Sequence, residues 1–126
     1  MSTVIITKTK ISSAVVPLSN MTIAFDPAIP ADTTARAEMS FDKPMKLSII
    51  NLSTDPEVTG EVRVMMDGSE QTLLTIGENN YVEIDVDETF GELLIRKLVL
   101  IAKTIRDTTQ TRQVVLKYSG ALYEFR

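Results

Sequence analysis

Residues 61–76 read EVRVMMDGSEQTLLTI, and this stretch decides the fold class of the 126-residue chain. Val62 and Val64 alternate with charged residues, which is typical of a strand that turns one face to a core and the other to water. Asp67 and Gly68 then interrupt the alternation. Because this dipeptide tolerates the positive φ angles of a tight primed turn, the stretch is predicted to fold as a β-hairpin.

Strand patterns recur on both sides of this hairpin, separated by segments rich in Pro, Asp, Asn and Ser, which favour turns. The further predicted strands are residues 1–16, 21–25, 36–41, 45–52, 81–86, 112–118 and 121–125. Residues 42–44 (DKP) and the pair Ser119-Gly120 are expected to separate neighbouring strands. Many short strands without strand–helix alternation predict a mainly β fold, an antiparallel β-sandwich or jelly roll, formed by one domain over residues 1–126.

The segment at residues 92–106 fits two structures. Leu94 and Leu98 begin a helical spacing of apolar residues, and Thr89 and Glu92 have the spacing of a capping box. Many β-branched residues within the segment, and strand patterns on both sides of it, favour a strand instead. We predict a strand here, with one helix around residues 92–106 as the alternative.

The composition excludes several kinds of chemistry. The chain has no Cys and no His, which removes disulfides, thiolate zinc sites and the side chain that most often activates a nucleophile. It also lacks the basic and apolar regions of a signal peptide and any apolar run near the roughly 20 residues that span a bilayer. We therefore expect a non-enzymatic protein without a cofactor, a membrane segment or a cleaved signal.

The formal net charge of −4 is distributed unevenly along the chain. Residues 1–25 contain two Lys and no acid, residues 26–92 contain 15 acids and 4 bases, and residues 93–126 contain 7 bases and 2 acids. Either the acidic middle pairs with the basic end across neighbouring strands, or the two signs lie on separate surfaces that meet partners. No nucleic-acid partner is expected, because the basic segment is short and the acidic remainder repels phosphate.

Glu83, Asp85 and Asp87 form the one candidate metal site. Their alternation places three carboxylates on one face of a strand, and carboxylate oxygens are ligands that Ca²⁺ prefers. However, Gly91 comes one position too late for the sharp turn of an EF-hand loop, and the bidentate Glu is missing. We interpret the three residues as a solvated strand face and expect no metal.

The N-terminal stretch MSTVIITKTKISSAVV raises a different possibility, because it is rich in β-branched residues and contains neither Gly nor an acid. Residues 1–16 are a candidate extended arm. A strand end exposes main-chain groups that need a partner, either in the same sheet or in another subunit, and the sequence leaves both open. The candidate interface residues are Val4, Ile5, Ile6, Lys8 and Lys10.

In these features (the start MSTVIITKTK, the Asp-Gly hairpin and the closing stretch VVLKYSGALYEF) the chain resembles the small β-sandwich or jelly-roll decoration proteins that cement the capsids of tailed bacteriophages. The resemblance implies a homo-oligomer that binds a major capsid protein or similar shell through strand edges and complementary charged surfaces. It also implies a virion component, assembled in the host cytoplasm, and no functional residue is transferred from it.

A β-sandwich module that binds a carbohydrate or a peptide is the alternative function. A sugar-binding surface needs exposed aromatic side chains, whereas this chain has only 6% aromatic residues and no Trp. The composition therefore favours assembly with other proteins over carbohydrate binding.

Overall fold

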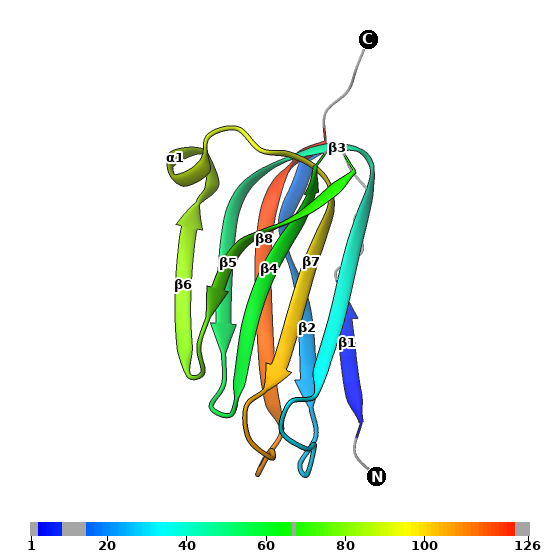
Figure 1. Cartoon of the computed structure of the whole chain (residues 1–126). Helices are drawn as coiled ribbons and strands as arrows, with labels where there is room; N and C mark the ends of the chain where they lie inside the picture. The colour runs from blue at the N-terminus through cyan, green and yellow to red at the C-terminus, as the bar shows by residue number, and fades with distance from the viewer. Residues whose placement is uncertain (1–2, 9–14, 67, 123–126) are drawn as a thin grey trace.

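The computed structural model describes residues 3–8, 15–66 and 68–122 of the chain. Eight strands and one short helix lie within these residues (Figure 1). The elements are β1 (Val4–Lys8), β2 (Val15–Phe25), β3 (Thr34–Thr54), β4 (Val58–Met66), β5 (Ser69–Ile76), β6 (Asn80–Asp85), α1 (Val86–Phe90), β7 (Leu94–Thr104) and β8 (Arg112–Leu122).

The strands form one antiparallel sheet in the order β1-β2-β8-β3-β7-β4-β5, and β6 pairs with β3 beside this path. Every pairing is antiparallel. The prediction of a mainly β, antiparallel fold is therefore confirmed.

Strand β3, with 21 residues, determines the shape of this sheet. Its first part, from Thr34 to Ser40, pairs with β7, whereas its last part pairs with β8 on one side and β6 on the other. Met45 lies where the partners change, opposite Ile95 of β7 and Leu122 of β8. The sheet consequently bends along β3 and curls back on itself into a half-barrel (Figure 1).

The break predicted at residues 42–44 is wrong, because the chain stays extended there and the two predicted strands are one. Pro44 lies where the register of β3 against β7 shifts, so its missing N–H removes no ladder bond to β7. The finer expectation of a sandwich or jelly roll is not confirmed, since a single continuous sheet encloses the core.

The turn predicted at Ser119-Gly120 is also wrong, because β8 runs through both residues. Leu47 faces Gly120 while Ile49 faces Ser119, so β3 has one extra residue at this point, a β-bulge. A Cβ atom on Gly120 would overlap the carbonyl oxygen of Lys46. The glycine is thus needed for the close approach of two strands and not for a turn.

Residues 92–106 contain β7, so the predicted strand is confirmed and the helical alternative is wrong. The middle of the strand is buried on both faces: Leu98 and Leu100 belong to the core, and Val99, on the opposite face, is also fully buried. Burial on both faces produces the nearly continuous apolar run whose spacing resembles that of a buried helix.

The helix α1 is a single turn that the sequence reasoning missed. The carboxylate of Asp85 caps it by accepting a hydrogen bond from the N–H of Glu88 at 3.2 Å. The capping box read from Thr89 and Glu92 is therefore wrong. No helix within the described part of the chain is long and apolar enough to cross a membrane.

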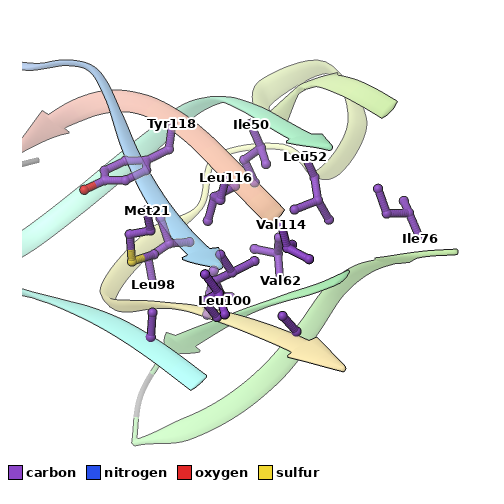
Figure 2. Close-up of a cluster of buried hydrophobic side chains, with 14 of the residues drawn as sticks. Met21, Ile50, Leu52, Val62, Ile76, Leu98, Leu100, Val114, Leu116 and Tyr118 are labelled. Carbon is purple, nitrogen blue, oxygen red and sulfur yellow. The ribbon is translucent and has the colours of Figure 1, made fainter. Parts of the chain in front are cut away.

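The core lies inside the curl of the sheet, where side chains from opposite halves meet (Figure 2). Its labelled members are Met21, Ile50, Leu52, Val62, Ile76, Leu98, Leu100, Val114, Leu116 and Tyr118. Tyr118 packs edge-on against Phe41, with 6.5 Å between the ring centroids. Burial raises the pKa of the Tyr118 hydroxyl to about 12, and this hydroxyl has no hydrogen-bond partner among the described residues.

The hairpin predicted at Asp67-Gly68 is confirmed: Met66 pairs with Ser69, and Gly68 has a φ of +78°. We expect Gly68→Ala to lower the free energy of unfolding by about 1 kcal/mol, because Ala adopts this φ at a cost. Gly77→Ala is the matched control, since Gly77 lies in open space without a positive φ. Equal stability of the two variants in urea denaturation would contradict this account of the turn.

Candidate interaction edge

Strand β1 lies at one end of the sheet and pairs only with β2 among the described strands. Val4 faces Phe25 and Ile6 faces Ile23 in this pairing. Within the described residues, Val4–Lys8 therefore pair with a strand of the same chain. What remains for a partner is the outer edge of β1.

The main chain of β1 alternates between this open edge and β2. The N–H of Asp26 donates to the carbonyl oxygen of Thr3 at 3.2 Å, so these two residues are a hydrogen-bonded pair. In an antiparallel ladder such pairs recur at every second residue, so Ile5 also directs its N–H and C=O toward β2. The N–H and C=O groups of Val4 and Ile6 consequently face the open edge.

The side chains of β1 are apolar and exposed: Val4 is 36%, Ile5 50% and Ile6 44% accessible. Val4 and Ile6 stand on the core-facing side of the sheet, because their partners on β2, Phe25 and Ile23, are fully buried. The core-facing row therefore continues onto β1, where the opposite half of the sheet no longer covers it.

An open groove of about 670 Å³ lies beside this edge, lined by Ile6 and by four residues of the first part of β3. The lining residues from β3 are Arg36, Ala37, Glu38 and Ser40. In Figure 1 β1 and this part of β3 run along the same side of the molecule. Nothing in the local sequence marks the β3 residues as neighbours of β1, and sequence reasoning missed them.

For two of the predicted interface residues, Lys8 and Lys10, the side chains lie outside the described part of the structure. Lys10 lies outside the described residues. Lys8 is the last residue of β1 and pairs with Met21, but its side chain is outside the described part. The candidate interface therefore rests on Val4, Ile5 and Ile6.

The open edges of the described sheet differ in the residues that they expose. β6 exposes Glu83 and Asp85, and β5, at the far end of the sheet, carries Glu70. The first part of β3, which pairs only with β7 among the described strands, carries Arg36 and Glu38. Charged residues on an edge strand discourage pairing with another chain. β1 carries Lys8 at its end, but its residues Val4, Ile5 and Ile6 are three consecutive exposed aliphatic side chains, so this edge offers an added strand the longest exposed aliphatic run among the described strands.

Charged side chains elsewhere pair within the chain. On the outer face of the sheet, Arg36 binds Glu70 with N–O distances of 2.6 and 2.9 Å and also contacts Glu38, while Arg63 contacts Glu61 and Glu70. Arg36, followed by Arg63, lowers the pKa of Glu70 to about 2. The network lies beside Val99, whose neighbours in register are Glu38 and Arg63, and this explains the burial of Val99.

The basic end of the chain pairs with the acidic middle, as the first of the two charge interpretations predicts. The four pairs are Lys97–Glu38 at 3.5 Å, Lys103–Asp32 at 3.4 Å, Arg106–Glu78 at 2.6 Å and Arg112–Glu57 at 2.8 Å. That interpretation is confirmed for these four basic residues.

Glu57 is the most buried of these acids and lies in the turn between β3 and β4, with a φ of +76°. It accepts hydrogen bonds from the N–H and hydroxyl of Thr109 and from Arg112. The Thr109 N–H, followed by Arg112, lowers the pKa of Glu57. Because each of these donors is directed at its carboxylate, Glu57 fastens the β7–β8 loop to the turn between β3 and β4.

Two of the three acidic residues of the metal hypothesis, Asp85 and Asp87, have other partners. Glu83 and Asp85 are exposed on β6, and Asp85 caps α1. Asp87 lies in the first turn of α1, with a carboxylate oxygen 3.5 Å from the Nζ of Lys46. Among the described residues no group of three or more acidic side chains is arranged to hold a metal ion.

A comparison with known protein families found no match, and a comparison with curated proteins found none either.

The ion pairs predict a dependence of stability on pH. Arg106, followed by the N–H of Glu57, lowers the pKa of Glu78 to about 2. Because this lies below the unfolded value of about 4.3, the pair stabilises the fold above that pH, and the contribution disappears as the pH falls toward 2. Glu78→Gln should therefore lower the melting temperature at pH 7 and flatten its decline between pH 5 and 2.

Glu83→Gln is the control, since this exposed carboxyl on β6 has no partner in the described structure and its loss should leave the decline unchanged. An acid profile of Glu78→Gln identical to that of the wild type would contradict a stabilising pair.

Proposed function

We propose that this protein is a non-enzymatic structural protein that decorates or cements a phage capsid and binds its shell through the edge of β1. The observation that carries the proposal is the set of three consecutive exposed aliphatic residues, Val4, Ile5 and Ile6, on a strand whose outer main chain has no partner among the described strands. Exposed apolar edge strands are templates for pairing with another chain.

The charges give the proposal less support than the edge does. Four basic residues of the final segment already pair with acids of the same chain, and exposed ion pairs contribute little. Recognition is therefore assigned to main-chain pairing and apolar contact, with charge in a secondary role.

Carbohydrate binding receives no comparable support. No aromatic side chain lines the groove beside β1, nor the smaller groove on the outer face formed by Thr34, Thr59, Thr75, Ile101 and their neighbours. Without an aromatic platform a sugar ring lacks its usual apolar contact. The capsid assignment itself comes from the resemblance of the sequence to decoration proteins.

The test uses shells assembled from the major capsid protein encoded in the same genome, mixed with the full-length protein and pelleted. We expect saturable co-sedimentation of the wild type. Ile5→Lys should lose it without a change in melting temperature, because Ile5 is half exposed and a charge on this edge opposes pairing.

Tyr81→Lys is the matched control: Tyr81 is 59% exposed on β6, which is not part of the β1 edge, and this variant should still co-sediment. A genome without a capsid gene, shells that do not bind the wild type, or equal loss in both variants would contradict the proposal.

A further inference from the structure

We infer that the groove between β1 and the first part of β3 accepts a single extended, uncharged segment of a partner protein, which pairs with the outer edge of β1. This inference rests on the proposed function, because it names what the partner contributes at the same edge. It is carried by the direction of the main chain, the position of the groove and the charge of its walls.

The main-chain hydrogen bonds between β1 and β2 determine which residues of β1 can pair with an added strand. Thr3 is hydrogen-bonded to Asp26, so the alternation of the ladder leaves the N–H and C=O groups of Val4, Ile6 and Lys8 directed away from β2. An added strand bonds to these three residues and leaves the bonds between Ile5 and β2 intact. Main-chain bonds of this kind supply affinity in strand addition.

The exposed side chains of Val4 and Ile6 provide an apolar surface against which an added strand can pack. Val4 and Ile6 continue the core-facing row beyond Phe25 and Ile23, yet remain 36% and 44% exposed. A strand placed against β1 covers them and directs every second side chain of its own into the groove. Burial of this apolar surface adds to the main-chain bonds.

The charges of the residues that line the groove determine which kind of segment can bind in it. Arg36 and Glu38 line it, but Arg36 is paired with Glu70 and Glu38, and Glu38 also lies 3.5 Å from Lys97. A charged occupant would meet no unpaired counter-charge among these described lining residues and would lose part of its hydration. The groove therefore fits small, uncharged side chains, with β-branched residues favoured by the extended conformation.

The shape of the groove favours a free segment over a second folded copy. A stable dimer buries about 800 Å² on each partner, and a five-residue edge strand is short for that role. Moreover, β3 bounds the groove on its far side. A lone extended segment can enter between these walls, whereas the rim of another sheet brings its own neighbouring strand.

The probe is the capped peptide Ac-KTVTVTVTK-NH2, whose central residues are uncharged and β-branched, added to the full-length protein. Binding is followed by titration calorimetry and by amide hydrogen exchange. We expect exchange at Val4, Ile6 and Lys8 to slow at least tenfold with peptide, while Ile5 and Thr7, already bonded to β2, change little.

Ile6→Pro removes one outward N–H and is expected to weaken peptide binding about tenfold. Its melting temperature should stay near that of the wild type, because proline is tolerated where the N–H of an edge strand faces solvent. Ile6→Lys, which keeps the N–H but adds a charge at the groove, should also weaken binding and provides a second test if the proline variant unfolds. Tyr81→Lys, on β6, is the control and should bind normally.

The inference is overturned if the peptide does not bind, if it protects amides of β6 or β5 instead, or if both Ile6 variants bind like the wild type. It is also overturned if the protein alone protects the β1 amides by self-association, seen as concentration-dependent sedimentation. Peptide binding without co-sedimentation with shells would contradict only the capsid role, and the reverse result would contradict only this inference.

Discussion

The fold depends on one constraint, the sharing of β3 between two sets of partners. Its first part pairs with β7 and its last part with β8 and β6, so neither half of the sheet can form its ladder without the same strand. The change of partner occurs at Met45, and close by the carbonyl oxygen of Lys46 comes so near to Gly120 that no larger residue fits. The two halves are therefore held face to face, and the core fills the space between them.

The candidate interface follows from this arrangement. Because β3 pairs with β7 in its first part and with β8 in its last part, the sheet curls without closing, and β1 is left at its end. The row of side chains that faces the core continues onto β1, beyond the part of the sheet that the opposite half covers. Val4 and Ile6 are therefore exposed beside a groove. The same geometry that builds the core thus creates an edge on which a further strand continues the sheet.

Local chemistry made part of this structure predictable. The Asp-Gly turn, most strand positions and the apolar character of Val4, Ile5 and Ile6 follow from neighbouring residues alone. The continuity of β3 and β8 does not, because Pro44 and Gly120 are turn-formers whose roles here are set by distant strands. Burial of Val99 beside the ion pairs of the outer face makes the middle of β7 a continuous apolar run, which also fits a helical spacing. The groove walls on β3 lie far from β1 in sequence.

The central claim is that close approach of β8 to β3 at the bend holds the two halves together, and the most direct test is the free energy of unfolding of Gly120→Ala, measured by urea denaturation. A methyl group here must displace the main chain of Lys46, so the account predicts a loss of about 1–3 kcal/mol, the usual cost of overpacking. A stability equal to that of the wild type would show that the strands have room to separate at this point, and would contradict the claim.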